Sequence, residues 1–280
     1  MRIAVWKTGH EIAGRVAEAI AGGLRGTGIR HTNCAELSGN LLRLDDVVGG
    51  EDLHIAYGIL RGTAEVFREC GRLGKPYIHL DRGYWKPGHY DGYYRVSLCG
   101  THQTAGLDKL SPDYERWRAL GVEMKPWRGF DHGKPVLVCP PTGEVAGFFG
   151  LDPELWRMQA VEASWWNDYE CLLHQPYANV KVRLKGDTWP LDFSDFNFVK
   201  TFNSSVGWQA LAAGIPCVSD PVHSIVGATY GKIPLEKLSE AQYMDRERLF
   251  GVMAGLQLTL EEIRAGKLWP LVSRLLHEGP

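Results

Sequence analysis

The chain has 280 residues, a formal net charge of −2, 44% apolar residues and 23% charged residues. This composition predicts a soluble globular protein with room for two domains, and it excludes nucleic-acid binding by bulk charge, although a local basic groove stays open. The first residues form a short apolar stretch that turns polar too soon for a signal peptide, so we expect a cytoplasmic protein without a membrane segment.

Strand and helix signals alternate along the first half of the sequence. Residues 3–6 predict a strand, and apolar residues at helical spacing predict a helix over 11–24. Further strands are expected at 29–32, 53–57, 76–80 and 93–98, and further helices at 63–73 and 111–120. Segment 125–134, with its Pro, Gly and Trp residues, is typical of a linker, and we place the domain boundary at residue 130.

The second half repeats the alternation. The expected strands are 135–139, 180–185, 198–202 and 216–219, and the expected helices are 153–173, 246–258 and 260–276. The pattern predicts an α/β fold of two Rossmann-like domains, residues 1–130 and 131–280, with the terminal helices in the second. Their parallel sheets are expected to face a cleft, with ligands outside the carboxyl ends of the strands.

Metal and cofactor motifs are missing from the sequence. The six cysteines lie far apart without a Cys-x-x-Cys pair, which favours free thiols in a reducing cytoplasm. The sequence also contains no Asp-x-Asp, no P-loop and no Gly-x-Gly-x-x-Gly. We therefore predict neither a metal site nor a cofactor.

A polar turn precedes the apolar helix signal that follows the strand at 198–202. Asn203, Ser204 and Ser205 stand at this helix start, and Gly207 would allow a ligand to come close. The free N–H groups and the dipole of a helix start attract anions, so these residues could bind phosphates. An ordinary helix cap with nothing bound is the alternative.

Positive side chains alternate along the predicted strand at 180–185. Period-two geometry puts Lys181, Arg183 and Lys185 on one face, where they could pair with a diphosphate, Arg183 in a bidentate manner. A solvated edge strand would also carry such lysines, and this remains the alternative.

The segment "TFNSSVGWQALAAGIPCVSDP" resembles the C-terminal nucleotide-binding motif of GT-B-fold glycosyltransferases, in particular of the capsule-polysaccharide and Kdo-type transferases and of phage-encoded relatives. The resemblance implies a metal-independent transfer of a sugar from a nucleotide-diphosphate donor to an acceptor hydroxyl. It implies that Ser204 and Ser205 contact the donor phosphates, with Arg183 and Lys185 nearby. Gln209 takes the place of a Glu that holds the donor ribose in the wider fold.

An acceptor hydroxyl needs a base, and the first half offers two candidates. His10 follows the first strand in a loop where several GT-B enzymes carry a His, and a capping or surface histidine is the alternative. Asp81 directly follows the fourth strand and is our first choice, with a structural salt bridge to Arg82 as the alternative.

The loop after Asp81 is rich in aromatic residues. Arg82, Tyr84 and Trp85 are the candidate acceptor-binding residues, because exposed rings can stack on a sugar or a base, while plain loop packing would explain them equally. The loop is similar to those of phage enzymes that decorate hydroxymethylated pyrimidines, which would make DNA the acceptor. Five arginines could then line a groove for DNA or could simply be scattered on the surface: Arg61, Arg68, Arg72, Arg82 and Arg95.

Two other classes of function would use the same anion site. One is a non-catalytic, two-lobed protein that binds a nucleotide or another small anion. The other is an epimerase of nucleotide sugars, which shares the donor site but needs no acceptor.

Overall fold

The computed structural model describes residues 1–25, 27, 29–34, 48–88, 90–128, 131, 133–171, 180–230 and 245–278, with the backbone alone at 30–34, 163–171 and 230. Contacts divide the chain into two units. Unit 1 contains Met1–Leu120 and Gly251–Pro280, and unit 2 contains Gly121–Phe250. Helix α9 (Arg246–Gly255) carries the chain from unit 2 back into unit 1.

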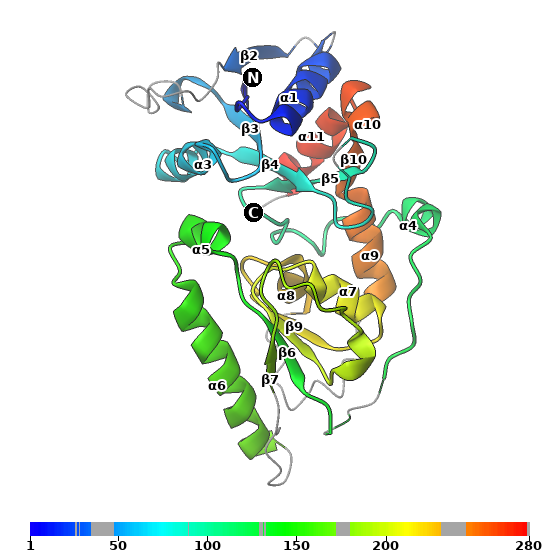
Figure 1. The fold of residues 1–280 in the computed structure, drawn as a ribbon. Helices are drawn as coiled ribbons and strands as arrows, with labels where there is room; N and C mark the ends of the chain where they lie inside the picture. The colour runs from blue at the N-terminus through cyan, green and yellow to red at the C-terminus, as the bar shows by residue number, and fades with distance from the viewer. Residues whose placement is uncertain are drawn as a thin grey trace. The chain divides into compact units, whose positions relative to one another are not determined.

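Unit 1 is built on a six-stranded mixed sheet (Figure 1). The strands are, in spatial order, β10 (Gln257–Thr259), β5 (Tyr93–Leu98), β4 (Tyr77–Arg82), β3 (Leu53–Tyr57), β1 (Arg2–Trp6) and β2 (Arg30–Cys34). The four from β4 to β2 are parallel, whereas β5 is antiparallel to both of its neighbours.

Helices cover both faces of this sheet. On one face lie α1 (Glu11–Leu24), α10 (Leu260–Arg264) and α11 (Leu268–Glu278), and on the other lies α3 (Thr63–Arg72), with α4 (Tyr114–Leu120) following β5 in the chain (Figure 1). Helix α10 comes so close to α1 that a Cβ on Gly23 would lie 2.2 Å from the carbonyl oxygen of Ile263. On the α3 face, Phe67 stacks on Tyr77 at 4.4 Å between ring centroids.

The terminal segment belongs to unit 1, which corrects the predicted division. The expected helix over 246–258 ends at Gly255, and the next residues form β10 on the edge of β5. A capping box between Thr259 and Glu262 then starts α10, and Arg116 binds Glu262 through two hydrogen bonds of 2.7 and 2.9 Å. Because β10 and these contacts tie the segment to the first sheet, the terminal helices are not part of the second domain.

The first half of the predicted linker packs within unit 2. The N–H of Lys125 donates to a carbonyl near the end of helix α7 (Val206–Ala212). Gly214, with φ of 79°, lies so close to this segment that a Cβ would be 1.9 Å from the carbonyl oxygen of Pro126. The change of unit therefore comes at Leu120, earlier than the predicted residue 130, which lies outside the described residues.

Unit 2 is built on a four-stranded parallel sheet. Its strands are, in spatial order, β7 (Val180–Val182), β6 (Val136–Cys139), β8 (Val199–Thr201) and β9 (Cys217–Ser219). Its remaining helices are α5 (Gly143–Phe149), α6 (Pro153–Cys171), the 3-10 helix η2 (Phe193–Asp195) and α8 (Ile225–Tyr230).

Helices lie on both faces of the second sheet as well. Helix α6 packs Ala160 against Val138 and Phe198 on one face. On the other face, Gly207 of α7 is so close to β8 and β9 that a Cβ would lie 3.3 Å from Thr201 and 3.2 Å from Cys217. The predicted α/β class with helices on both faces is confirmed; the second sheet is parallel throughout, whereas the first is parallel only from β4 to β2.

Candidate functional site

The carboxyl edge of the unit 2 sheet contains a topological switch point between β6 and β8. After β6 the chain continues to α6 on the Val138 face, whereas after β8 it enters α7 on the opposite, Thr201 face. In open α/β sheets, ligands bind outside the carboxyl ends of strands at such a point. The loops 140–142 and 202–205 flank this position. We use the name unit 2 edge for these two loops and the carboxyl ends of β7 and β9.

The predicted phosphate-binding turn lies at this edge. The hydroxyl oxygen of Ser204 accepts the N–H of Val206, the first residue of α7, at 3.3 Å. Ser205 is exposed and its side chain makes no cap hydrogen bond. Asn203 is half-buried beside them, and Gln209 is exposed on α7. The hydroxyl of Ser205 and the amide of Gln209 are therefore open to a ligand.

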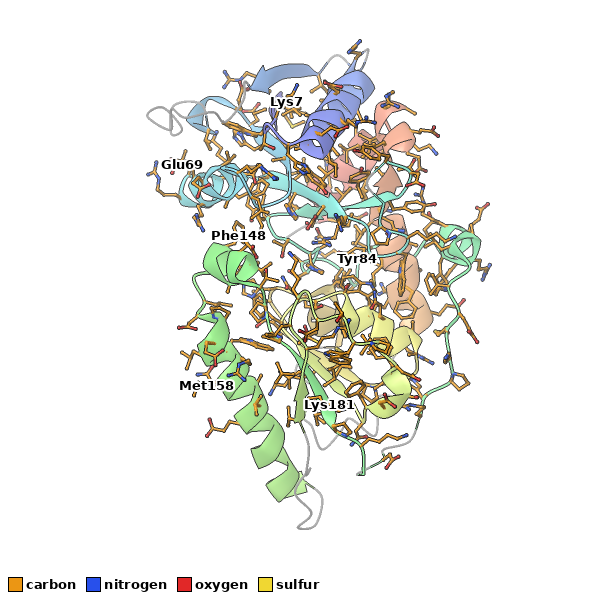
Figure 2. All side chains as sticks on the ribbon, in the orientation of Figure 1. Lys7, Glu69, Tyr84, Phe148, Met158 and Lys181 are labelled. Carbon is orange, nitrogen blue, oxygen red and sulfur yellow. The ribbon has the colours of Figure 1, made fainter. Side chains whose placement is uncertain are left out.

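The predicted row of three cations does not form, because β7 ends at Val182. The N–H of Leu184 instead donates to Asp187 at 2.8 Å and the chain turns. The guanidinium of Arg183 lies 4.4 Å from the ring centroid of Trp189 and donates to its carbonyl oxygen at 2.9 Å. Lys181 extends over the ring of Phe196 at 5.7 Å (Figure 2).

Lys185 is the exposed cation of this loop. The pKa of Glu144, at the start of α5, is lowered by its own backbone N–H and by Thr142, and to a smaller extent by the charge of Lys185. Since α5 follows β6, the charge of Lys185 reaches the start of the helix after β6.

The unit 2 edge also holds an aspartate–histidine pair at the end of β9. Asp220 Oδ1 lies 2.8 Å from Nδ1 of His223, and the Asp220 N–H donates to Phe202 O at 3.1 Å, next to the Ser204 turn. The His223 ring lies 4.2 Å from Phe149 and 5.3 Å from Phe202, between ring centroids. About a third of each polar side chain is exposed, with 32% for His223 and 29% for Asp220.

Sequence reasoning missed this pair. The signal that could have found it is Asp-x-x-His directly after a predicted strand, which places both residues at a carboxyl edge.

In unit 1, Asp81 lies at the carboxyl end of β4, as predicted. Its partner is Arg95 rather than Arg82, at 2.7 Å across the antiparallel pair β4–β5, and its second oxygen accepts the N–H of Arg82 at 2.8 Å. Burial alone would raise the pKa of Asp81, but Arg95 and His79 outweigh it and hold this pKa below its usual value. A carboxylate held in this way is a weak base, and the catalytic role of Asp81 stays a prediction.

His10 lies at the start of α1, in the loop that follows β1. Its N–H approaches the hydroxyl of Thr8 at 3.4 Å, and its side chain makes no cap hydrogen bond. In the same loop Lys7 turns back to α1 and pairs with Glu18 at 3.7 Å (Figure 2). The loop lies at the switch point between β1 and β3, so its position agrees with a ligand-facing role that stays a prediction.

The predicted stacking platform is not exposed in unit 1. Tyr84 (labelled in Figure 2) and Trp85 are 3% and 5% exposed, and their rings lie 5.6 Å from His102 and 5.1 Å from Trp117, respectively. These two residues serve as core side chains, which corrects their proposed contact with an acceptor. Arg82 is exposed at the end of β4.

The arginines considered for DNA binding are largely paired with acids. Arg68 pairs with Glu65 at 3.2 Å and Arg95 with Asp81 at 2.7 Å. Arg72 also pairs with a glutamate of its own helix, three residues away. Pairing of this kind cancels much of the positive field that a phosphate backbone would need.

Among the described residues, no group of three His, Cys, Asp or Glu side chains lies close enough together to hold a metal ion. No helix in this part of the chain combines the length and the apolar character needed to span a bilayer.

The chain matches no protein-family model and no curated protein. Among solved structures it is similar to two Kdo transferases of Thermosulfurimonas dismutans KpsC. With the beta Kdo 2,4 transferase it shares 10% identity over 90% of both chains at a TM-score of 0.43. With the beta Kdo 2,7 transferase it shares 12% identity over 96% of this chain and 100% of that chain, at 0.44.

It is also similar to the UDP-GlcNAc 2-epimerase of Methanocaldococcus jannaschii, with 10% identity over 98% of this chain and 99% of that chain, at a TM-score of 0.30. Likenesses of this size carry no conclusion about activity. The α/β class follows from the strand order of the two sheets themselves.

Proposed function

We propose that this protein transfers a sugar from a nucleoside-diphosphate donor to a hydroxyl acceptor, and that the donor diphosphate binds at the unit 2 edge. The observation that carries the proposal is the set of side chains at the β6–β8 switch point. The Ser204–Ser205 turn and the Asp220–His223 pair meet there through the hydrogen bond from Asp220 to Phe202.

The charge of a diphosphate can be balanced at this edge. Lys185 is exposed in the loop after β7, where its charge reaches Glu144 at the start of α5, and Ser205 offers a hydroxyl without a cap hydrogen bond. Arg183 donates to the carbonyl oxygens of Trp189 and Asp187, and two of the five N–H groups of its guanidinium are used in this way. Lys185 and Ser205 would stabilise the leaving diphosphate without a metal ion.

The setting of the proposed reaction is the reducing cytoplasm, where nucleotide sugars are substrates of transferases. Among the described residues, the thiols of Cys70, Cys99, Cys139 and Cys217 are free. Hydroxymethylpyrimidine DNA is retained as one acceptor to be tried, beside sugars and small alcohols.

Calorimetry with nucleoside diphosphates and their sugars tests the donor site. We expect binding by the wild type, and about tenfold weaker binding in Lys185→Gln because one charge-assisted hydrogen bond is lost. Lys181→Gln is the matched control, since it removes the same charge from the same segment but from a side chain that extends over Phe196. Equal weakening in both variants, or no binding of any nucleotide, would contradict the proposal.

Product analysis separates the three classes of function. Transfer or hydrolysis that releases a nucleoside diphosphate, unchanged by EDTA, supports a metal-independent transferase. An altered sugar still attached to its nucleotide identifies an epimerase. Binding without any turnover identifies a non-catalytic binding protein.

A further inference from the structure

The Asp220–His223 pair has the geometry of a base and the group that orients it. An ionised carboxylate only accepts hydrogen bonds, so at 2.8 Å from Asp220 Oδ1 the Nδ1 atom of His223 carries a proton. In the neutral imidazole this leaves the lone pair on Nε2. Within the described ranges, no hydrogen bond to Nε2 from a protein group is present.

The surroundings hold this ring in one place. Phe149 and Phe202 lie against it from α5 and from the end of β8. Asp220 is in turn held by the N–H groups of Val222 and His223, at 2.9 and 2.8 Å. A ring fixed on two sides and at Nδ1 meets a requirement for proton transfer, because its remaining nitrogen has a defined direction.

We propose that His223 is the general base of the sugar transfer and that Asp220 is its positioning residue; this rests on the proposed function. The acceptor O–H bond breaks and its proton passes to Nε2 of His223. The acceptor oxygen then bonds to the anomeric carbon, whose bond to the diphosphate oxygen breaks with the electron pair leaving on the diphosphate. The Asp220 carboxylate stabilises the imidazolium that forms.

The base predicted from the sequence fits this role less well. Both oxygens of Asp81 are engaged, one by Arg95 at 2.7 Å and the other by the Arg82 N–H at 2.8 Å. Releasing a carboxylate from its cation before each proton transfer would add to the barrier. His223 needs no such release, because its contact with Asp220 strengthens as the proton arrives.

Asp220 also holds the turn before α8 in place, so the experiment has to distinguish this structural role from the proposed catalytic one. Its Oδ1 accepts two backbone N–H groups of the turn before α8. Asp220→Asn keeps an oxygen for these bonds but removes the charge that stabilises the imidazolium. Asp152 is a matched control, because its Oδ1 accepts the N–H groups of Glu154 and Leu155 in the same manner without a histidine partner.

The test measures release of nucleoside diphosphate from a donor sugar, with water as acceptor, in the full chain. We expect His223→Ala to lower kcat by about 10²–10⁴-fold, with the Kd for nucleoside diphosphate within threefold of wild type and with partial rescue by added imidazole. Asp220→Asn should lower kcat at least tenfold at unchanged Kd, without rescue. Asp152→Asn and His277→Ala, an exposed histidine of α11, should match wild type.

Three results would overturn the inference. If His223→Ala turns over at the wild-type rate, His223 is not the base although the transferase stands. If it raises the Kd tenfold at unchanged kcat, His223 is a phosphate ligand instead. If the wild type consumes no donor, the proposed function fails and this inference fails with it.

Discussion

The carboxyl edges of the two sheets carry similar residues in different states. In unit 1, Asp81 is locked to Arg95, and the neighbouring His79 is 1% exposed. In unit 2, Asp220 lies 2.8 Å from Nδ1 of the half-buried His223, and Lys185 and Ser205, at the ends of other strands of the same sheet, are exposed.

The difference shows that a charged residue at a strand end does not by itself indicate a site. What matters is whether its hydrogen-bonding capacity is already used by the same unit. At the unit 1 edge near β4, the carboxylate of Asp81 is already paired with Arg95, and this ion pair contributes to the stability of the fold. At the unit 2 edge we propose that such groups bind a ligand instead, and stability and binding measurements can test this difference.

The largest expected effect is the acid sensitivity of unit 1 through His79. Burial lowers the pKa of His79 to about 4, against a smaller opposing effect of Asp81. In the unfolded chain His79 takes up a proton near pH 6.5. Its contribution to the free energy of unfolding is therefore fully present above that pH and is lost toward pH 4, by about 3 kcal/mol in total. Thermal unfolding from pH 7 to 4 should show a flatter profile in His79→Leu, and identical slopes would contradict the prediction.

Removing the ion pair between Arg95 and Asp81 should have the next largest effect on stability. Arg95→Met deletes hydrogen bonds to Asp81, to Thr101 O at 3.1 Å and to Arg82 O at 3.0 Å. We expect a loss of about 2 kcal/mol in the free energy of unfolding, below the 3–5 kcal/mol of a fully buried pair because Asp81 is partly exposed. Denaturant titration measures it.

Arg68→Met is the matched control for this loss, since it breaks an exposed helical pair with Glu65 and should cost less than about 0.5 kcal/mol. If the two variants lose equal stability, the ion pair between Arg95 and Asp81 does not stabilise the edge of unit 1 more than an exposed pair does.

A smaller effect is expected on substitution of Lys200 in unit 2, which should stabilise the protein, whereas Arg95→Met should destabilise it. This residue lies on β8 between Val138 and Val218, no acid of the described residues pairs with it, and burial lowers its pKa to about 8. The unfolded state holds the proton up to a higher pH, so stability should rise as the pH increases from about 8 to 10.5.

Lys200→Met should remove that dependence and stabilise unit 2 at neutral pH by about 1–2 kcal/mol, because a buried charge is replaced by an apolar chain of similar length. Denaturation curves at pH 7 and pH 10 measure both effects. A destabilised variant would indicate that the ammonium has a partner in the native protein.

The smallest effects on stability are expected at the unit 2 edge itself. Ser205→Ala and Lys185→Gln remove exposed groups and should change the free energy of unfolding by less than about 0.5 kcal/mol. The same variants should weaken nucleotide binding. We therefore expect a large increase in Kd, measured by calorimetry, together with a nearly unchanged melting temperature. A large fall in stability would mean that these groups are structural, as those of Asp81 and Arg95 are.

Much of the fold could be predicted from local patterns. The strand–helix alternation around β1 and α1 and the Ser204 turn before α7 were placed close to where the structure has them. Apolar spacing and capping preferences act within a few residues, and for that reason they are readable without a partner segment.

The errors came from contacts between distant segments. Gln257–Thr259 was expected to be the end of a helix, but it forms β10 because β5 offers an open edge and Gln257 accepts the N–H of Trp85 at 3.1 Å. Tyr84 and Trp85 were proposed to bind the acceptor, with plain loop packing as an equal alternative, and both side chains are buried.

Short-range spacing was enough to predict two α/β halves and the segments that end at their carboxyl edges. The state of each charged group was decided only when the chain folded. Strand register brought Arg95 to Asp81, and the turn after β9 brought His223 to Asp220. Such pairings decide whether a carboxylate forms an ion pair with a cation or orients a base. A local sequence pattern does not show which distant residue will become the partner.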